Sequence, residues 1–164
     1  MKKKIGLTGS SGSLGKELIK NKRGIKFCYF KNDITNRKKV FNWVKKNKLN
    51  VIIHLAARVP IIEVNKNKEK SKKINYFGTK NLVDACIKEK INWFFFASTS
   101  HVYSSSKQKI LESNKTSPIS YYGKTKLYAE KYIIKKFEKY GINYCIGRIF
   151  STTNINQKKN YLLP

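Results

Sequence analysis

Short, mostly apolar runs alternate with stretches of helical periodicity along the whole chain. We expect the apolar runs to form strands at residues 5–7, 25–30, 51–57, 93–97 and 144–150. The runs at 51–57 and 93–97 are nearly continuous in apolar residues, which is typical of parallel strands covered on both faces. The stretches between the runs therefore have to supply the covering helices.

Helical patterns fill most of the gaps between these runs. We expect helices after the glycines of 9–15, from 33–36 onward, over 82–87 and over 122–140, with Gly141 as the last helix stop. Strands separated by helices predict a single Rossmann-like domain over residues 1–164, an α/β fold with a doubly wound parallel sheet. Such sheets bind ligands at the carboxyl ends of their strands.

Three glycines follow the first expected strand at the spacing Gly-x-x-Gly-x-x-Gly, at Gly9, Gly12 and Gly15. Glycine lets the turn close tightly and lets the backbone approach a pyrophosphate, whose charge would face the amides of Ser13 and Leu14 at the helix start. The motif is weak by itself, but its position between a strand and a helix is the context in which it indicates dinucleotide binding. The alternative is a flexible Gly/Ser turn without a ligand, because such clusters often mark ordinary loops.

The chain is strongly basic, with a formal net charge of +27 over 164 residues. A charge of this size favours nucleic acid or an anionic membrane surface as a partner. The lysines are scattered over the whole sequence instead of clustering with aromatic residues, so we expect no specific nucleic-acid partner. A basic nucleic-acid binder stays as a third functional hypothesis, which salt-dependent retention on DNA or RNA would test.

Targeting signals and cysteine pairs are both missing from the sequence pattern. No apolar run reaches about 18 residues, and the apolar start ends at residues 8–9, too early for a signal peptide. We therefore expect a cytoplasmic protein with no membrane partner. The cysteines Cys28, Cys86 and Cys145 are widely spaced within apolar stretches, which favours buried thiols over a redox pair.

Six short motifs follow one another along the chain, at residues 8–15, 33–36, 54–57, 75–79, 98–103 and 122–126. In order and spacing they resemble the signatures of the extended short-chain dehydrogenase/reductases. That class contains the NAD-dependent epimerases and dehydratases of nucleotide sugars and reductases of the dTDP-4-dehydrorhamnose reductase type. The resemblance covers essentially the full chain and implies hydride transfer between a sugar carbon and the nicotinamide of NAD or NADP.

The family motif Tyr-x-x-x-Lys is uninformative by itself, because lysine is so common in this chain. The pattern occurs at Tyr76/Lys80, Tyr103/Lys107, Tyr122/Lys126 and Tyr132/Lys136. Only Tyr122 combines the start of a helix with a preceding Ser-Thr strand end and a long loop. Lys126 shares its helical face one turn on, where an ammonium favours the phenolate of a tyrosine whose ordinary pKa is about 10.

The resemblance implies a catalytic role for Thr99, Tyr122 and Lys126. Tyr122 would remove or return a hydroxyl proton of the sugar, and Lys126 would also bind the nicotinamide ribose. Thr99 falls where a Ser or Thr hydroxyl of the family bonds the reacting oxygen. Ser98 and Ser100 are adjacent, so this last assignment can slip by one position.

The expected cofactor-binding residues come from the glycine loop, the following strand ends and the Tyr-Lys helix. They are Gly9, Ser11, Gly12, Ser13, Leu14, Gly15, Asp33, Ile34, Leu55, Ala56, Ala57, Ser98, Tyr122 and Lys126. Asp33 has three interpretations: an adenine contact, which the resemblance favours, a ribose contact, which would favour NAD, and a helix cap. Lys31 lies near the place of a 2'-phosphate, so NAD and NADP both stay open.

Two histidines are tempting as catalytic bases, but we expect both to be structural. His54 is a usual member of the strand-end motif of the resembled family, and His101 has no carboxylate near it in the sequence. Two such histidines do not form a metal site, and we expect none. The resemblance also implies that Asn75 ties neighbouring backbone segments together behind the site.

Members of the resembled family continue into a smaller domain that grips the nucleotide sugar. This chain stops at residues 161–164, soon after residues 147–151, where Ser151 replaces the asparagine of a substrate-binding strand end. We therefore expect a truncated gene or fragment whose C-terminal substrate-binding domain is largely missing, or a remainder supplied elsewhere. The alternatives to an active enzyme are a non-catalytic NAD(P)-binding module and an inactive fragment. The expected partners are a nucleotide-sugar substrate and, as one option, a second copy in a homodimer.

Overall fold

The computed structural model describes residues 4–59 and 61–151, which contain one sheet of five parallel strands. The strands are β1 (Ile5–Thr8), β2 (Phe27–Phe30), β3 (Val51–His54), β4 (Trp93–Thr99) and β5 (Asn143–Ile149). Their order is β2-β1-β3-β4-β5, so the direction of winding reverses between β1 and β3. The five predicted strands are confirmed, but the third ends at His54 and residues 55–57 lie in the loop beyond it. The chain end at residues 161–164 lies outside the described residues.

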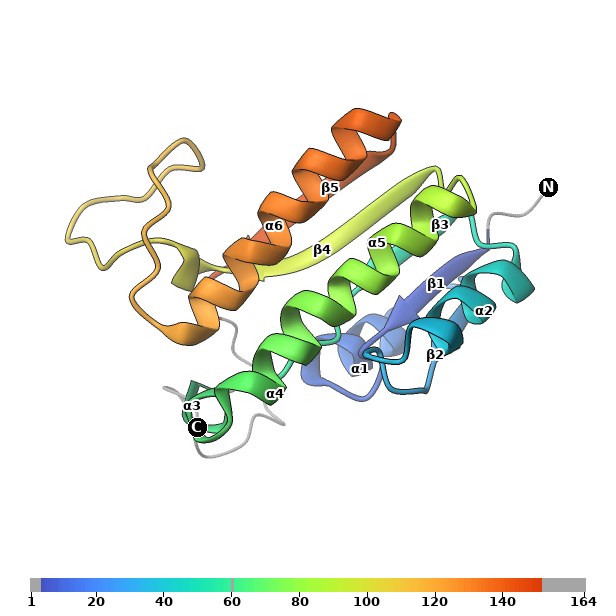
Figure 1. The fold of residues 1–164 in the computed structure, drawn as a ribbon, viewed down its shortest axis with the longest axis horizontal. Coiled ribbons are helices and arrows are strands. Elements are labelled where there is room, and N and C mark those ends of the chain that lie inside the picture. Colours follow the sequence, from blue (N-terminus) through green and yellow to red (C-terminus); the bar gives the residue numbers. More distant parts are fainter. Residues whose placement is uncertain (1–3, 60, 152–164) are drawn as a thin grey trace.

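Four helices cover the two faces of this sheet (Figure 1). They are α1 (Ser13–Lys20), α2 (Arg37–Asn47), α5 (Thr79–Lys88) and α6 (Tyr121–Tyr140). Helices α2, α5 and α6 pack side by side on one face, whereas α1 lies on the opposite face. This arrangement confirms the predicted doubly wound α/β fold.

The segment between β3 and α5 contains helices that the apolar pattern did not predict. They are α3 (Ile61–Lys66), α4 (Lys68–Lys72) and the π-helical turn η1 (Lys73–Gly78). Helices α3 and α4 each bury one residue, Val64 and Ser71, so neither has a stripe long enough to be recognised. Contacts with α6 hold both in place. A short 3-10 turn, η2 (Ser100–Val102), follows β4.

Side-chain caps and a glycine define the ends of α2 and α6. The side chains of Asn36 and Ser120 each accept a hydrogen bond of 3.0 Å from a first-turn amide of their helix. Gly141 ends α6 with a φ of 65°, in the left-handed region that glycine adopts without strain. The interpretation of Asp33 as a helix cap is wrong, because Asn36 holds that position in α2.

The core lies between the sheet and the layer of α2, α5 and α6. Phe94 and Phe96 of β4 are fully buried, and the Phe94 ring packs edge-on against Phe137 of α6 at 5.2 Å between centroids. Val44 of α2 and Leu82 of α5 complete the layer. Burial of each such side chain contributes about 1.5–3 kcal/mol. These contacts hold the carboxyl ends of the strands in fixed positions.

The three cysteines differ in exposure, so the prediction of buried thiols is right only in part. Cys86 is buried, Cys28 is half-buried and Cys145 is exposed on the edge strand β5.

Within residues 4–59 and 61–151, no helix has both the length and the apolarity to cross a bilayer. In that same part of the chain, no three or more His, Cys, Asp or Glu residues gather closely enough to hold a metal ion.

Candidate functional site

Three strand ends meet at one edge of the sheet and carry the candidate site. In the parallel register Thr8 of β1 lies beside His54 of β3, and His54 lies beside Phe96 of β4. The Leu55 amide donates to the Thr8 carbonyl at 3.2 Å, so the loops after β1 and β3 start side by side. Strand β4 continues three residues further, to Thr99. A doubly wound sheet binds its ligands at this edge, where the winding reverses.

The three loop glycines differ in what surrounds them. A Cβ on Gly9 would lie 2.5 Å from the Ala56 nitrogen, and a Cβ on Gly15 would lie 2.2 Å from the Gly9 oxygen. These two glycines therefore let backbone segments pack closely. A Cβ on Gly12 would meet only the Gly9 oxygen, at 3.4 Å, which is an ordinary contact. The space over Gly12 is thus open to a ligand.

Helix α1 begins next to this space without a side-chain cap. Gly12 is its N-cap residue, and the first turn contains no acidic side chain. The side chains of Ser11, Ser13 and Leu14 are exposed around it. The first amides of a helix carry a partial positive charge and need an acceptor, so this helix end suits an anion such as a phosphate.

Asp33 and Ile34 follow β2 at the same edge, but their side chains have different environments. The Asp33 carboxylate accepts bonds from the Thr35 amide and hydroxyl, both at 2.8 Å, and these bonds lower the pKa of Asp33. Ile34 is buried against Gly78, whose Cβ would lie 2.5 Å from an Ile34 methyl carbon. The exposed Asp33 carboxylate can meet a ligand, whereas the Ile34 side chain belongs to the core.

His54 is buried and bridges two threonine hydroxyls. Its Nδ1 lies 2.7 Å from Thr8 Oγ1, and its Nε2 lies 2.9 Å from Thr79 Oγ1. Burial lowers the pKa of His54 from 6.5 to about 3, and the Lys126 ammonium adds to this lowering. A neutral ring held between β1 and α5 supports the structural role expected for His54.

The depressed pKa of His54 predicts a loss of stability in acid. Below pH 6.5 the unfolded chain binds a proton that the folded chain takes up only near pH 3, so acidification favours unfolding. Between pH 7 and pH 5 this residue is expected to remove about 2 kcal/mol from the free energy of unfolding. Urea unfolding of wild type and His54→Gln at both pH values measures it, since the glutamine does not titrate. Equal acid sensitivity of the two proteins would contradict the prediction.

Asn75 ties the loop after β3 to the start of α6. Its Oδ1 accepts from the Arg58 amide at 2.6 Å, and its Nδ2 donates to the Arg58 carbonyl and to the Thr125 hydroxyl, both at 3.2 Å. Thr125 in turn donates to the Tyr122 carbonyl at 2.7 Å. The buried Asn75 thus joins backbone segments as expected, and it fixes the helical turn that carries Tyr122.

The end of β4 presents two hydroxyls with different partners. Ser98 donates its proton to the buried carboxylate of Glu130. Thr99 accepts a hydrogen bond from the His101 amide at 3.2 Å, which leaves the proton of its own hydroxyl for another acceptor. Both side chains are almost fully buried at the strand end. Of these two hydroxyls, that of Thr99 is the one able to donate to a bound group.

Gly123 brings the start of α6 against the turn that follows β4. A Cβ at this position would lie 2.0 Å from the His101 carbonyl oxygen, so only glycine permits the approach. The neighbouring Tyr122 ring meets the His101 ring edge-on at 5.9 Å between centroids. The need for this glycine could not be read from helical periodicity, because it depends on a contact between distant segments.

Lys126 lies one helical turn after Tyr122 and is 2% exposed. Its Nζ sits 4.0 Å from the centroid of the Phe96 ring. Burial lowers the pKa of Lys126 from 10.5 to about 7, while the Glu130 carboxylate acts against this lowering. The charged and neutral forms of Lys126 are therefore close in free energy at neutral pH.

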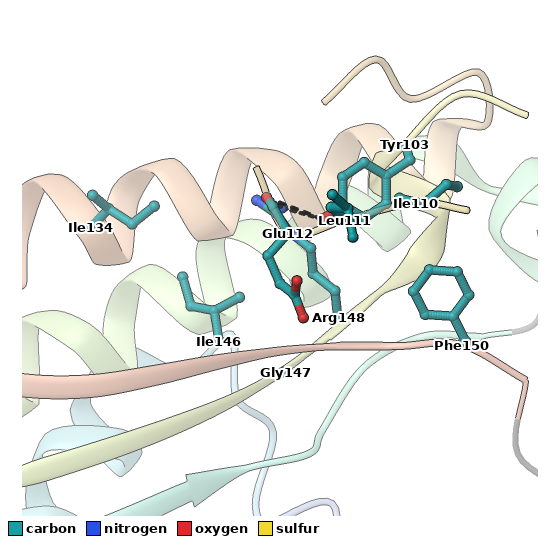
Figure 2. A pocket seen from close by; sticks show the side chains of 9 residues that line it. All are labelled: Tyr103, Ile110, Leu111, Glu112, Ile134, Ile146, Gly147, Arg148 and Phe150. Atoms are coloured by element: carbon teal, nitrogen blue, oxygen red, sulfur yellow. Dashed lines mark hydrogen bonds between the residues drawn. The ribbon is translucent and has the colours of Figure 1, made fainter. Parts of the chain in front are cut away.

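An ion pair that sequence reasoning missed joins α6 to β5. Glu130 is 1% exposed, and Arg148 Nη2 lies 2.9 Å from its Oε2. Arg148 also donates from Nη1 to the Tyr103 hydroxyl at 2.5 Å and to the Glu112 carbonyl at 3.2 Å (Figure 2). The resemblance implied that the strand end around Arg148 helps to bind substrate, but the guanidinium is directed to groups of the protein itself.

A signal for this pair was present in the sequence. Glu130 falls four positions after Lys126 and three before Ile133, within the face of α6 that packs on the sheet. An acid on a packed face needs a buried partner of opposite charge. Arg148 was the nearest candidate on the next strand, but the pairing becomes visible only when β5 lies beside β4.

A cavity of about 440 Å³ lies beside this ion pair (Figure 2). Its apolar wall includes Ile110, Ile134, Ile146 and Phe150, and Arg148 contributes to its polar wall. Thr99, Tyr122 and Lys126 are not among the lining residues. The cavity and the site at the strand ends are therefore separate features.

The other tyrosines with a lysine four residues on have structural contacts. Tyr132 donates to Asp84 at 2.6 Å, and burial together with this bond raises the pKa of Tyr132. Tyr76 packs edge-on against Tyr132 at 6.3 Å between centroids, and Tyr103 accepts the bond from Arg148. All three are therefore engaged in contacts that hold the helices and β5 together.

Known proteins that the chain resembles are named for reactions of nucleotide sugars. A protein of Bacillus subtilis named uncharacterized UDP-glucose epimerase YtcB is 29% identical, over 94% of this chain and 58% of its own length. The dTDP-4-dehydrorhamnose reductase of Bacillus anthracis, solved with NADP, is 27% identical with a TM-score of 0.82, over 92% of this chain and 54% of its own. The UDP-glucose 4-epimerase of Thermus thermophilus, solved with NAD, is 19% identical with a TM-score of 0.82, over 88% and 54%.

The chain thus spans somewhat more than half the length of these proteins. The resemblance to extended short-chain dehydrogenase/reductases that the six motifs predicted is confirmed. A family model described as the RmlD substrate binding domain matches residues 3–162, and the chain belongs to that family.

Proposed function

We propose that this chain is the NAD(P)-binding part of an enzyme that transfers hydride at a carbon of a nucleotide sugar. The relatives named above are a UDP-glucose epimerase and a dTDP-4-dehydrorhamnose reductase, and the solved ones hold NAD or NADP. Epimerases, dehydratases and reductases of this kind share hydride transfer at a sugar carbon, so the proposal covers all three. A non-catalytic NAD(P)-binding module is the competing function.

One arrangement carries this proposal: the open glycine loop and the Thr99, Tyr122 and Lys126 group lie at the same edge of the sheet. The space over Gly12 and the uncapped amides of α1 fit the pyrophosphate of a dinucleotide. Asp33, which follows β2, would meet the adenosine end of that dinucleotide. Residues 55–57 and Ser98 follow the two strand ends that the cofactor would cross. When bound, the dinucleotide supplies the nicotinamide carbon that accepts or returns hydride.

Tyr122 is the proposed acid/base, because it starts α6 beside the end of β4. Its phenolate oxygen takes the proton of the reacting sugar hydroxyl, and its phenol form returns that proton in the reverse direction. The Lys126 ammonium, one turn further along the same face, favours the phenolate form that accepts this proton. Its position also suits a bond to the nicotinamide ribose. Tyr122 and Lys126 therefore act as one unit, as the resemblance implies.

Thr99 is the proposed donor to the reacting oxygen, in preference to Ser98. The Ser98 hydroxyl already donates to Glu130, which turns it toward the interior. The Thr99 hydroxyl accepts from a backbone amide and keeps its proton to donate. Among the two, the hydrogen-bond pattern thus supports Thr99, and Ser98 would contact the cofactor through its backbone.

Titration with NAD and NADP, followed by nicotinamide fluorescence or calorimetry, tests the binding part of the proposal. The chain is expected to bind at least one of them. Turnover of UDP-linked and dTDP-linked sugars by the full-length protein tests the chemical part. Tight dinucleotide binding without turnover of any such sugar would favour the non-catalytic module, and failure to bind either dinucleotide would refute both.

Asp33→Ala is expected to weaken dinucleotide binding by roughly 10- to 100-fold, the equivalent of one bond to a charged group at about 1.5–3 kcal/mol. Comparing NAD with NADP shows which ribose the carboxylate faces. Asp33→Asn is the matched control, because it keeps an oxygen for the Thr35 turn and removes the charge. If the alanine variant binds both dinucleotides as wild type does, Asp33 only shapes its own turn.

A further inference from the structure

Glu130 is a buried acid in a chain where 9 acidic residues face 36 basic ones. An unpaired carboxylate buried this deeply would strongly destabilise the protein. The groups that bind Glu130 therefore indicate its role. Oε1 accepts from the Ser98 hydroxyl, and Oε2 accepts from Arg148 Nη2 at 2.9 Å and from Nε at 3.2 Å. The carboxylate thereby connects α6 to the ends of both β4 and β5.

The same carboxylate lies one helical turn after Lys126, on the buried face of α6. Residues four apart on a helix are neighbours, so the two charges interact inside the protein, where screening is weak. The Lys126 ammonium also lies over the face of the Phe96 ring, which is a weaker partner for a cation than a carboxylate. Glu130 is thus the acid whose charge acts on the buried ammonium and opposes the effect of burial on its pKa.

Other titratable groups from the elements packed on α6 do not replace this anion. They include His54 of β3, Glu63 of α3, Lys68 and Glu69 of α4, Tyr76 of η1, Lys80 and Asp84 of α5, His101 of η2 and Arg148 of β5. The three acids in this set are more exposed than Glu130 and bind other groups: Glu63 binds Arg58 and Lys66, Glu69 binds Lys73, and Asp84 binds Arg37 and Tyr132. His54 is neutral at physiological pH, and Arg148 is already bound to Glu130.

We infer that Glu130 is a positioning residue: its buried carboxylate holds the ends of β4 and β5 against α6 and, one helical turn from Lys126, supports the charged form of that lysine. This inference rests on the proposed function only where Lys126 meets the cofactor. The Glu130 carboxylate is what opposes the lowering of the Lys126 pKa by burial. Without it, Lys126 would be neutral at pH 7, and the charge that assists Tyr122 and a bound ribose would be lost.

Titration of Lys126 by NMR tests the inference without any cofactor. In the chain labelled with ¹³C at the lysine ε carbons, Lys126 is expected to titrate near pH 7, far below the ordinary lysine value of about 10.4. Lys126→Arg identifies the signal by removing it. In Glu130→Gln the midpoint is expected to fall by roughly one to three pH units. Glu130→Asp keeps the charge and is expected to restore part of the shift.

Glu138→Gln is the matched control, because Glu138 is an exposed acid two turns further along α6, bonded to the Tyr144 hydroxyl. Its loss is expected to leave the Lys126 midpoint unchanged. An equal midpoint in wild type and folded Glu130→Gln would overturn the inference. If the single variant folds poorly, Glu130→Gln combined with Arg148→Met leaves no unpaired guanidinium, and the same downward shift is expected.

Dinucleotide affinity measured from pH 5.5 to pH 8.5 separates this inference from the proposed function. In Glu130→Gln the loss of affinity with rising pH is expected to occur at lower pH than in wild type, by the same interval as the Lys126 midpoint. If the wild-type chain binds neither NAD nor NADP, the proposed function is refuted. The titration of Lys126 then still tests the role of Glu130, because it needs no cofactor. If the Lys126 midpoint shifts in Glu130→Gln but the pH dependence of dinucleotide affinity stays the same as in wild type, the link between Glu130 and cofactor binding is overturned.

Discussion

Tyr122→Phe is expected to lower the turnover of the full-length protein by about 10²- to 10⁴-fold, the usual cost of losing a positioned general acid/base. Phenylalanine keeps the ring that packs against His101 and removes only the hydroxyl. The Asn75 and Thr125 hydrogen bonds fix this helical turn through its backbone, so they persist in the variant. Dinucleotide affinity is therefore expected to change little. Steady-state kinetics with the nucleotide-sugar substrate and a parallel dinucleotide titration measure both quantities.

Tyr132→Phe is the matched control for this prediction. Tyr132 lies on the same helix and also has a lysine four residues on, but its hydroxyl is bonded to Asp84 of the neighbouring helix α5. The turnover of the Tyr132→Phe variant is expected to stay within a few-fold of that of the wild type. Lys126→Ala, by contrast, is expected to reduce both turnover and dinucleotide affinity. Near-normal turnover of folded Tyr122→Phe would refute the acid/base assignment and favour the non-catalytic module.

Gly12→Val is expected to weaken dinucleotide binding by roughly 100-fold or more. The valine would fill the open space over Gly12 and keep a pyrophosphate from the amides at the start of α1. Losing two bonds to a charged group at about 1.5–3 kcal/mol each accounts for this size. The melting temperature is expected to change little, because a Cβ at this position makes only an ordinary contact. Calorimetric titration with a parallel thermal melt measures the two effects.

Gly15→Ala provides the opposite pattern within the same loop. Its Cβ would lie 2.2 Å from the Gly9 oxygen, so backbone has to move and the melting temperature is expected to fall markedly. The two variants therefore separate a glycine that admits a ligand from one that admits backbone. A folded Gly12→Val protein with unchanged affinity would show that the loop does not hold the pyrophosphate.

Local patterns along the chain were sufficient to predict the main elements of this fold. Continuous apolar runs indicated β3 and β4, because parallel strands buried on both faces have no polar side to reveal. The stop of α6 at Gly141 followed from one residue, because glycine is the residue that best adopts the left-handed end of a helix. Helices α3 and α4 could not be predicted, because each is too short to show a stripe and depends on α6 for support.

Position along the chain is also the reason why Tyr122, among four equivalent Tyr-Lys patterns, is the proposed acid/base. The cap of α2 was less clear, since Asp33, Thr35 and Asn36 are all suitable residue types and only the three-dimensional path of the chain selected Asn36. The sequence does not distinguish Gly9, Gly12 and Gly15 from one another. Their different roles depend on what lies next to each, which is the loop after β3 for Gly9 and open space for Gly12.

The sequence by itself determined the five strands, the main helices between them and the family, because these depend on residues that are close together along the chain. Only the tertiary structure decided that Ser98 is turned toward the interior, that Arg148 forms an ion pair with Glu130, and that Lys126 is buried near Glu130. Those facts depend on β4, β5 and α6 meeting in space. Charge and burial act through distance in three dimensions, so a pKa or an ion pair is set by neighbours that the linear sequence keeps far apart.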